Sequence, residues 1–119
     1  MSDELALTAR LSYNKGGASV TRAVNITVDV TGEAYTSNVQ LVTTASEVEI
    51  LQGAGLGQPG YIIAKNLHAT NYVEIGATTG VYTIKILAGE TAMWRHDSTT
   101  IFAIAHTTDC LLEYTIIEE

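Results

Sequence analysis

Three histidines, one cysteine and a glycine-rich stretch are the residues whose types and spacing could support chemistry in this sequence. The groups His96-Asp97 and His106-x-x-Asp109-Cys110 offer metal ligands, or a nucleophile beside a base. The metal sites of jelly-roll enzymes need several converging ligands, typically with two histidines separated by one residue, and this sequence has no His-x-His. The spacing from His106 to Cys110 is typical of a turn. We therefore expect no metal site here.

The stretch GLGQPG at residues 55–60 matches the G-x-G-x-x-G pattern of dinucleotide-binding loops. In those loops the pyrophosphate lies at the N-terminus of a helix that must follow the last glycine. Here Tyr61, Ile62 and Ile63 follow instead, and these residues favour a β-strand. We therefore expect a surface loop or a subunit contact, with no bound nucleotide and no other cofactor.

Cys110 and Trp94 each admit a functional and a structural interpretation. Cys110 begins an apolar segment with no neighbour in the sequence that would lower the pKa of its thiol, which favours an inert buried thiol. Trp94 offers a stacking platform for a sugar ring, but a large core or interface side chain is the simpler interpretation. A single cysteine forms no internal disulfide. Taken with the histidines, these residues predict a protein that is not an enzyme.

The elements that position these residues are predicted to be β-strands. Residues 5–13 alternate between apolar and polar, which predicts a half-buried strand. Asn14-Lys15-Gly16-Gly17 then predicts a turn, because glycine and asparagine tolerate positive φ. Alternation resumes over residues 20–30, with Arg22 as the exception on the apolar face. The predicted inward residues are Leu5, Leu7, Ala9, Leu11 and Tyr13, then Val20, Val24, Ile26, Val28 and Val30.

The second half of the chain is more densely apolar, and its strand candidates follow one another with short turns. They are YIIAKNL, YVEIG, VYTIKIL, ETAMWRH, TIFAIAH and CLLEYTIIE. Enrichment in β-branched and aromatic residues, with one proline, predicts an all-β fold: an antiparallel β-sandwich or jelly roll of about eight to ten strands. No linker divides the 119 residues, so we expect a single β-sandwich domain over residues 1–119.

Charge and hydropathy exclude several classes of partner. Thirteen acidic residues against six basic ones give a net charge of −7, and the basic residues are scattered. A nucleic acid would be repelled by this charge, so none is expected as a partner. The first residues are acidic where an export signal would be basic, and no apolar run approaches the roughly 20 residues of a membrane span. We expect a soluble protein made in a cytoplasm, without a membrane partner.

The stretch KNLHATNYVEIG, residues 65–76, combines a polar cluster with flanking strand formers. Residues 68–71 are of types that hydrogen-bond their own backbone, which predicts a β-turn between YIIAKNL and YVEIG. The polarity of the cluster is then explained without a ligand.

Three segments carry a resemblance to a known group of proteins: KNL-x-ATNYVEIG, a strand ending in LAGE, and the terminal LEYTIIEE. Over residues 60–119 the chain resembles small virion structural proteins of tailed bacteriophages. The resemblance implies a virion component made in the host cytoplasm. Acidity suits an outer-surface part, because it prevents adhesion to packaged DNA. We therefore expect a capsid decoration (cement) protein that stabilises the outer shell.

Such a protein would have two partners: itself, and the major capsid protein or another virion protein. Decoration proteins usually match the symmetry of the shell, which implies a homotrimer at threefold positions. Contacts are expected from residues 1–4 and from the loops around residues 33–38 and 53–60, because loops can vary without unfolding the sandwich. The candidate interface residues are Asp3, Glu4, Glu33, Tyr35, Asn38, Gly55, Leu56, Gln58 and Trp94.

Three alternatives stay open. A tail, neck or head-fibre-base component belongs to the same class of virion proteins. A carbohydrate-binding β-sandwich module would need exposed aromatic residues, for which Trp94 and six tyrosines are available. A small jelly-roll enzyme comes third, and a metal analysis would test it.

Overall fold

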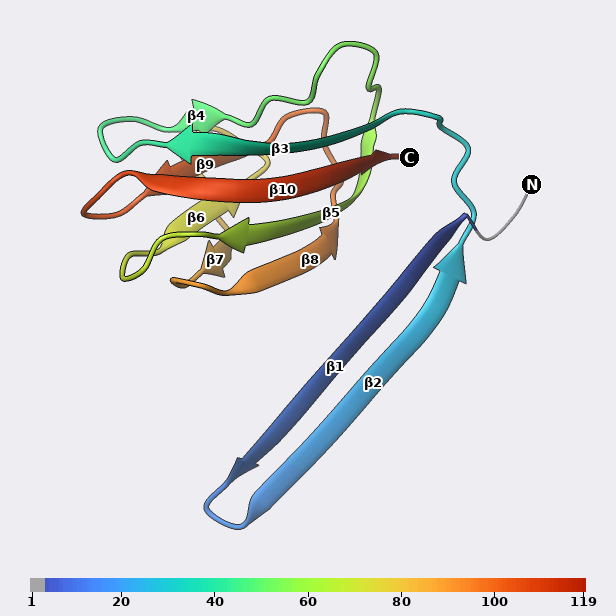
Figure 1. Cartoon of the computed structure of the whole chain (residues 1–119), viewed down its shortest axis with the longest axis vertical. Helices are drawn as coiled ribbons and strands as arrows, with labels where there is room; N and C mark the ends of the chain where they lie inside the picture. The colour runs from blue at the N-terminus through green and yellow to red at the C-terminus, as the bar shows by residue number, and fades with distance from the viewer. Residues whose placement is uncertain (1–3) are drawn as a thin grey trace. The chain divides into compact units, whose positions relative to one another are not determined.

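A computed structural model describes residues 4–119 and shows ten β-strands in antiparallel pairs, which confirms the predicted all-β class (Figure 1). No helix among these residues has the length and apolarity needed to span a membrane. The strands are β1 (Leu5–Lys15), β2 (Ala18–Val28), β3 (Tyr35–Val42), β4 (Val48–Glu49), β5 (Pro59–Asn66), β6 (Val73–Gly76), β7 (Ile84–Ile86), β8 (Thr91–Arg95), β9 (Phe102–Ala105) and β10 (Cys110–Glu118).

The chain divides into two compact units, residues 1–31 and 32–119. The first unit contains the hairpin of β1 and β2, which pair along their whole length from Leu5 opposite Val28 to Lys15 opposite Ala18. Gly16 and Gly17 form the turn with φ of 60° and 87°. Positive φ at both central residues gives the twist that a two-residue hairpin turn requires. The turn predicted at these glycines is therefore present.

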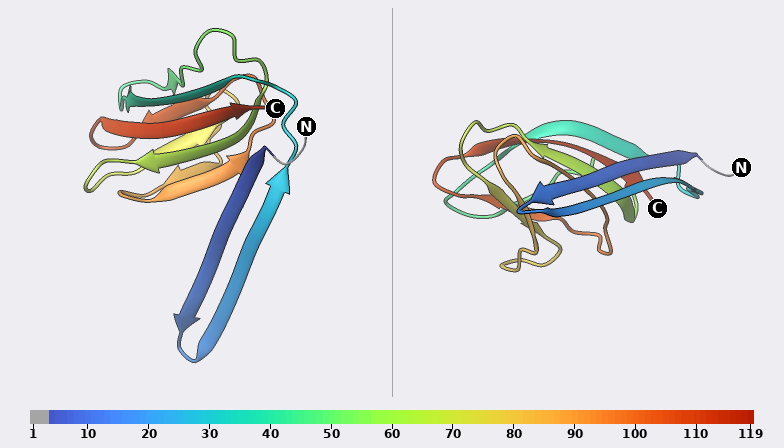
Figure 2. Two further views of the ribbon diagram at one scale, coloured as in Figure 1. Left: turned by 45° about the vertical axis from the view of Figure 1, so that its right-hand side comes forward. Right: turned by 90° about the horizontal axis from the view of Figure 1, so that it is seen from below.

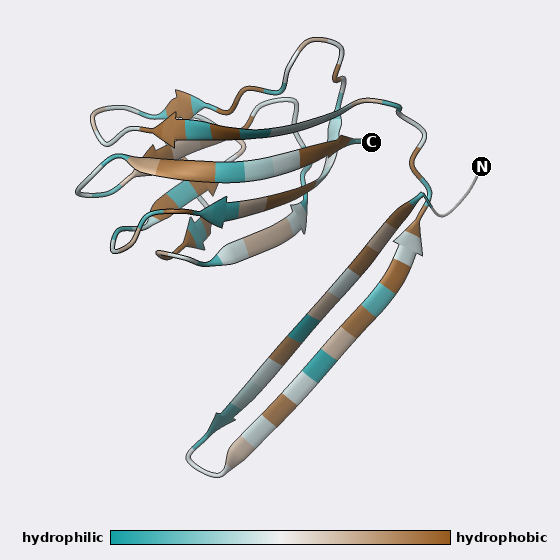
Figure 3. Cartoon of the chain, viewed as in Figure 1, coloured by the Kyte–Doolittle hydropathy of each residue, from teal (hydrophilic) through white to brown (hydrophobic). Residues whose placement is uncertain are grey.

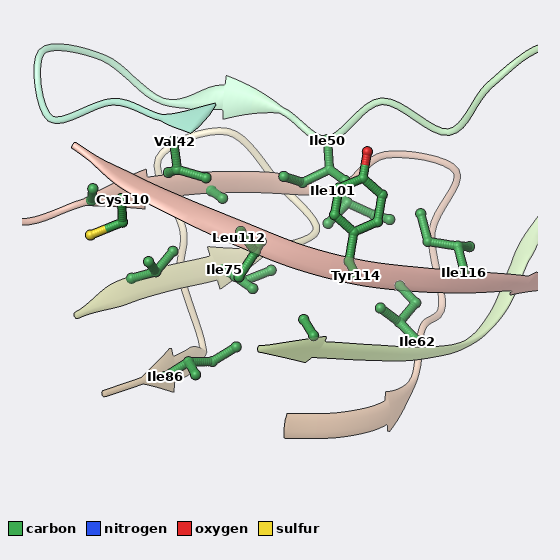
Figure 4. Packing of buried hydrophobic residues seen from close by; sticks show 14 residues of the cluster. Val42, Ile50, Ile62, Ile75, Ile86, Ile101, Cys110, Leu112, Tyr114 and Ile116 are labelled. Carbon is green, nitrogen blue, oxygen red and sulfur yellow. The ribbon is translucent and has the colours of Figure 1, made fainter. Parts of the chain in front are cut away.

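The second unit consists of two four-stranded sheets, with strand orders β3-β10-β5-β8 and β4-β9-β6-β7 (Figure 2). Its core is built around β10, whose alternate residues Cys110, Leu112, Tyr114 and Ile116 are buried. Figure 4 shows these side chains among those of neighbouring strands. The rest of the buried cluster is Val42, Ile50, Ile62, Ala64, Val73, Ile75, Ile86, Ile101, Ala103 and Ala105.

The sequence placed residues 5–30 in the same sandwich as the rest of the chain, and here the structure differs. β1 and β2 form a sheet of their own, and the sandwich sheets use strands between residues 35 and 118. The hairpin face predicted to be half-buried is largely exposed, with Leu11 61% and Tyr13 50% accessible. Alternation shows which side chains share a face (Figure 3), but it does not show what covers that face.

Candidate protein–protein interface

The hairpin is a two-sided ribbon because the register of β1 and β2 places like residues opposite one another. Ile26 lies opposite Leu7, and Val20 lies opposite Tyr13, so these side chains share one face. The other face is polar. Its opposed pairs include Thr8 with Asn25 and Ser12 with Thr21.

The described residues of the hairpin unit provide no layer that covers its apolar face, because they form one two-stranded sheet. Leu7 is buried and Leu5 and Val28 are half-buried, but the remaining large apolar side chains of this face are 42–61% accessible: Leu11, Tyr13, Val20, Val24 and Ile26. An isolated two-stranded hairpin is at best marginally stable in water. A contiguous exposed apolar face of this kind marks an interaction surface. We define the apolar hairpin face as Leu5 to Tyr13 at odd positions and Val20 to Val28 at even positions.

Positive charge accompanies this face. Residues 5–28 contain Arg10, Lys15 and Arg22 and no acidic residue, whereas residues 32–119 contain ten acidic and three basic residues. Arg22 lies within the apolar hairpin face, directly opposite Leu11, and its Nη1 donates a hydrogen bond to the neighbouring Thr21 carbonyl, 3.0 Å away. Over the whole first unit, residues 1–31, three acidic and three basic residues balance, whereas the second unit carries a net charge of −7. A surface that covers the hairpin strands must accommodate a guanidinium group.

A second exposed apolar surface lies on the outside of the β3-β10-β5-β8 sheet, on the side opposite the core. Its large apolar members are 37–69% accessible: Tyr35, Val39, Leu41, Ile63, Met93 and Leu111. Glu113 lies among them on β10, opposite Val39 of β3 and Lys65 of β5. We call this surface the outer sheet face.

The middle of the outer sheet face is hollowed. A shallow depression of about 250 Å³ lies over β3, β10, β5 and β8, with Ser37, Ile63, Lys65, Thr91, Glu113 and Thr115 in its lining. The small side chains of Ser37 and Thr115 lie opposite each other, and their hydroxyl oxygens are 2.9 Å apart.

The two loops that the sequence assigned to contacts meet at the carboxylate of Glu118. Its Oε1 accepts hydrogen bonds from the backbone N–H groups of Glu33 and Ala34, at 2.9 and 3.1 Å, and its Oε2 accepts one from Gly57. Hydrogen bonds from the backbone of Gly57, Ala34 and Glu33 lower the pKa of this carboxyl below its ordinary value. One ionised side chain thus joins the 33–34 segment to the 53–60 loop.

The remaining predicted contact residues lie in different places. Asp3 lies outside the described residues. Glu4 is exposed, and its Oε1 accepts a hydrogen bond from the Val30 N–H at 3.0 Å, which closes the base of the hairpin. Tyr35 and Asn38 are both exposed on β3, and Gly55 is exposed with a φ of 89°. Of this group, Tyr35 is the one that lies on the outer sheet face.

Three of the predicted contact residues are half-buried and not exposed on the surface: Leu56, Gln58 and Trp94. Leu56 and Trp94 pack against the core of the sandwich. The indole Nε1 of Trp94 donates a hydrogen bond to Nδ1 of the buried His96, at 3.0 Å. Trp94 therefore has the features of the structural interpretation, a core side chain, rather than those of a sugar-stacking platform.

The titratable side chains singled out in the sequence do not converge. His96 lies against Trp94 and Thr100, whereas the imidazole Nε2 of His106 is 2.6 Å from Oε1 of Glu74. The pKa of the Cys110 thiol is raised, by burial and then by the charge of Asp109, so the thiol is a poor nucleophile. Among residues 4–119 no group of three or more His, Cys, Asp or Glu side chains is placed to hold a metal ion.

The polar stretch after β5 is a loop with bends at Ala69 and Thr70, and it leads from β5 in one sheet to β6 in the other. Asn66 is fully buried, and its Nδ2 donates to the carbonyls of Asn71 and Ile86, at 2.8 and 3.1 Å. Its Oδ1 accepts from the N–H of His68, whose Nδ1 in turn accepts from the N–H of Thr70 and of Asn71. Each of these polar groups has a partner within the chain, so the cluster needs no ligand.

Sequence reasoning missed the outer sheet face and took the apolar hairpin face for core. Two signals were available: Arg22 within an otherwise apolar face, and apolar residues on both faces of the segment CLLEYTIIE. Each departs from the simple alternation of a strand with one face in the core and one polar face. Comparisons of the chain with protein-family models, curated proteins and solved structures found no match.

Proposed function

We propose that this protein is a bacteriophage virion structural protein, a capsid decoration protein that binds the outer shell as a homo-oligomer and stabilises it. The observation that carries the proposal is the exposure of two extended apolar surfaces, the apolar hairpin face and the outer sheet face. Both are larger than a scatter of single apolar residues, and both suit burial against other chains.

Three further features support an assembly role. The acidic surface, with a net charge of −7, disfavours contact with packaged DNA and favours a place outside the shell. The resemblance of residues 60–119 to small virion proteins of tailed bacteriophages points to the same class. The hairpin also favours assembly, because its open strand edges and its apolar face are sites at which further chains can pack.

Capsid binding tests the proposal directly. Purified protein would be mixed with capsids that lack it, prepared from the phage whose genome encodes the chain, and the pelleted capsids would be assayed for bound protein. We expect saturable, stoichiometric binding and capsids that resist heat better than bare ones. Binding to purified tails or necks with none to capsids would move the protein to another part of the virion. Binding to neither would contradict the proposal.

A further inference from the structure

We propose that the hairpin of one copy packs its apolar face on the outer sheet face of a second copy, with Arg22 beside Glu113, so that copies exchange hairpins in a closed assembly. This inference rests on the homo-oligomer part of the proposed function, and it names the surfaces through which copies associate.

The two surfaces match in chemistry. Each is predominantly apolar and largely exposed, and each carries a charge among its apolar side chains. On the hairpin the charge is Arg22, and on the sheet it is Glu113, accompanied by Lys65. Within the described residues neither Arg22 nor Glu113 forms an ion pair. Docking brings together opposite charges that would otherwise lose water without compensation.

Charge also distinguishes this arrangement from a packing of hairpin on hairpin. Residues 5–28 hold three basic residues and no acidic one, so two stacked hairpins would bury Arg22 of each copy without a counter-charge. The sandwich unit, residues 32–119, is net acidic. A basic ribbon is therefore attracted to the sandwich of another copy and repelled by the ribbon of another copy.

The dimensions of the hairpin determine how much surface is buried when its apolar face packs on the sheet of another copy. β1 and β2 have 11 residues each. With a rise of about 3.4 Å per residue and about 4.8 Å between strands, one face of the ribbon covers roughly 350 Å². Burying it on a sheet removes roughly 700 Å² of surface in total. Two copies that exchange hairpins reciprocally therefore bury about 1,400 Å², within the range of stable interfaces, and a closed ring of three buries about 2,100 Å² over its three contacts. A single hairpin-on-hairpin contact would bury about half as much as the reciprocal exchange.

The hinge between the units is short. The Val30 N–H is bound to Glu4 of the first unit, and the Gly32 N–H donates to the Glu119 carbonyl of the second, 2.9 Å away. Short hinge loops can promote domain swapping, in which an element packs on a neighbouring copy. We therefore assign the occupant of the outer sheet face as the hairpin of a second copy.

A charge-swap cycle tests the contact. The variants Arg22→Glu, Glu113→Arg and the double variant would be compared with the original chain by light scattering and sedimentation equilibrium. We expect each single variant to weaken association at least tenfold, because like charges then meet at the contact, and the double variant to recover most of the loss. Arg10→Glu, on the polar face of the same hairpin, is the matched control: it changes the net charge of the hairpin by the same amount but lies outside the contact, so it should weaken association by no more than about twofold.

The outcomes separate this inference from the proposed function. Circular dichroism would first establish that each variant retains the β spectrum and unfolding midpoint of the sandwich, whose buried cluster contains neither residue 22 nor residue 113. An oligomer that is unaffected by either single variant, or a double variant that is no better than the singles, would overturn the exchange while leaving capsid binding untouched. A monomer would overturn it too. Loss of capsid binding by an intact, exchanged oligomer would instead count against the proposed function.

Discussion

Leu11 and Arg22 are direct partners across the β1–β2 ladder, and both side chains are exposed on the same face of the hairpin. The pair combines an apolar surface that is unfavourable in water with a cation that is unfavourable in an apolar interface. A partner surface that is apolar around a carboxylate resolves both problems. The outer sheet face offers such a carboxylate in Glu113, which lies among Val39, Leu41 and Ile63 and opposite Lys65.

Adding a charge to the apolar hairpin face should disrupt association, because the charge must lose water when the face is covered. We expect Val24→Asp to shift the protein towards the monomer by at least tenfold in the dissociation constant, measured by sedimentation equilibrium. The neighbouring Asn25→Asp adds the same charge to the polar face and should leave the constant within about twofold. Equal effects of the two variants would argue against a role for the apolar face.

Removing the buried amide of Asn66 should destabilise the sandwich, because two carbonyls and one N–H lose their partners inside the protein. We expect Asn66→Ala to lower the free energy of unfolding by about 2–4 kcal/mol, measured by urea denaturation. Asn25→Ala is the control, since Asn25 is exposed on β2, and it should cost less than about 1 kcal/mol. A neutral Asn66→Ala would show that water replaces the amide.

The Glu118 carboxylate should make the 53–60 loop sensitive to acid. Its pKa is lowered in the folded chain, by the backbone N–H groups of Gly57, Ala34 and Glu33, so its contribution to stability is complete above its unfolded pKa, ordinarily 4.5. That contribution is lost as the pH falls through the lower, folded pKa.

We expect amide hydrogen exchange at Glu33, Ala34 and Gly57 to quicken in Glu118→Gln at pH 7, because a neutral amide is a weaker acceptor. Below the folded pKa of Glu118, the original chain and the variant should exchange alike. The neighbouring Glu119→Gln variant is the comparison: its side chain forms an exposed ion pair with Arg95 and should not affect the loop. Equal protection of the three amides in Glu118→Gln at neutral pH would contradict the anchoring role.

Cys110 should react slowly with thiol reagents in the folded chain. Its side chain is fully buried, and burial raises the pKa of the thiol, so little thiolate is present at neutral pH. We expect labelling by a disulfide reagent to be at least a hundredfold slower at pH 7.5 than in denaturant, followed by absorbance. Rapid labelling of the native protein would mean that the region between β9 and β10 opens readily.

Much of the local structure could be predicted from the sequence, because it depends on neighbouring residues. Gly16 and Gly17 determine the hairpin turn, the polar types of residues 68–71 indicate the loop after β5, and the runs of β-branched residues indicate the strands. The class of fold follows from these features. The burial of alternate residues along β10 also follows from its pattern, once a second sheet is assumed to cover it.

The features that define the candidate interface could not be predicted in the same way. The alternation of residues 5–13 is the same whether the apolar face lies in a core or on an exposed ribbon, so the sequence alone favoured a core. The carboxylate of Glu118 binds groups 61–85 residues away in the chain, a relationship that no local pattern encodes. Arg22 was the residue that departed from the pattern, and it now lies at the centre of the proposed contact.

The mass of the full chain in solution is the measurement that tests self-association most directly. Light scattering would be recorded over a range of micromolar concentrations in low and in moderate salt. We predict a closed oligomer with a mass that is an integral multiple of 12.7 kDa, a trimer if the assembly matches a threefold position, and weaker association at higher salt. A mass of 12.7 kDa at every concentration would contradict the account.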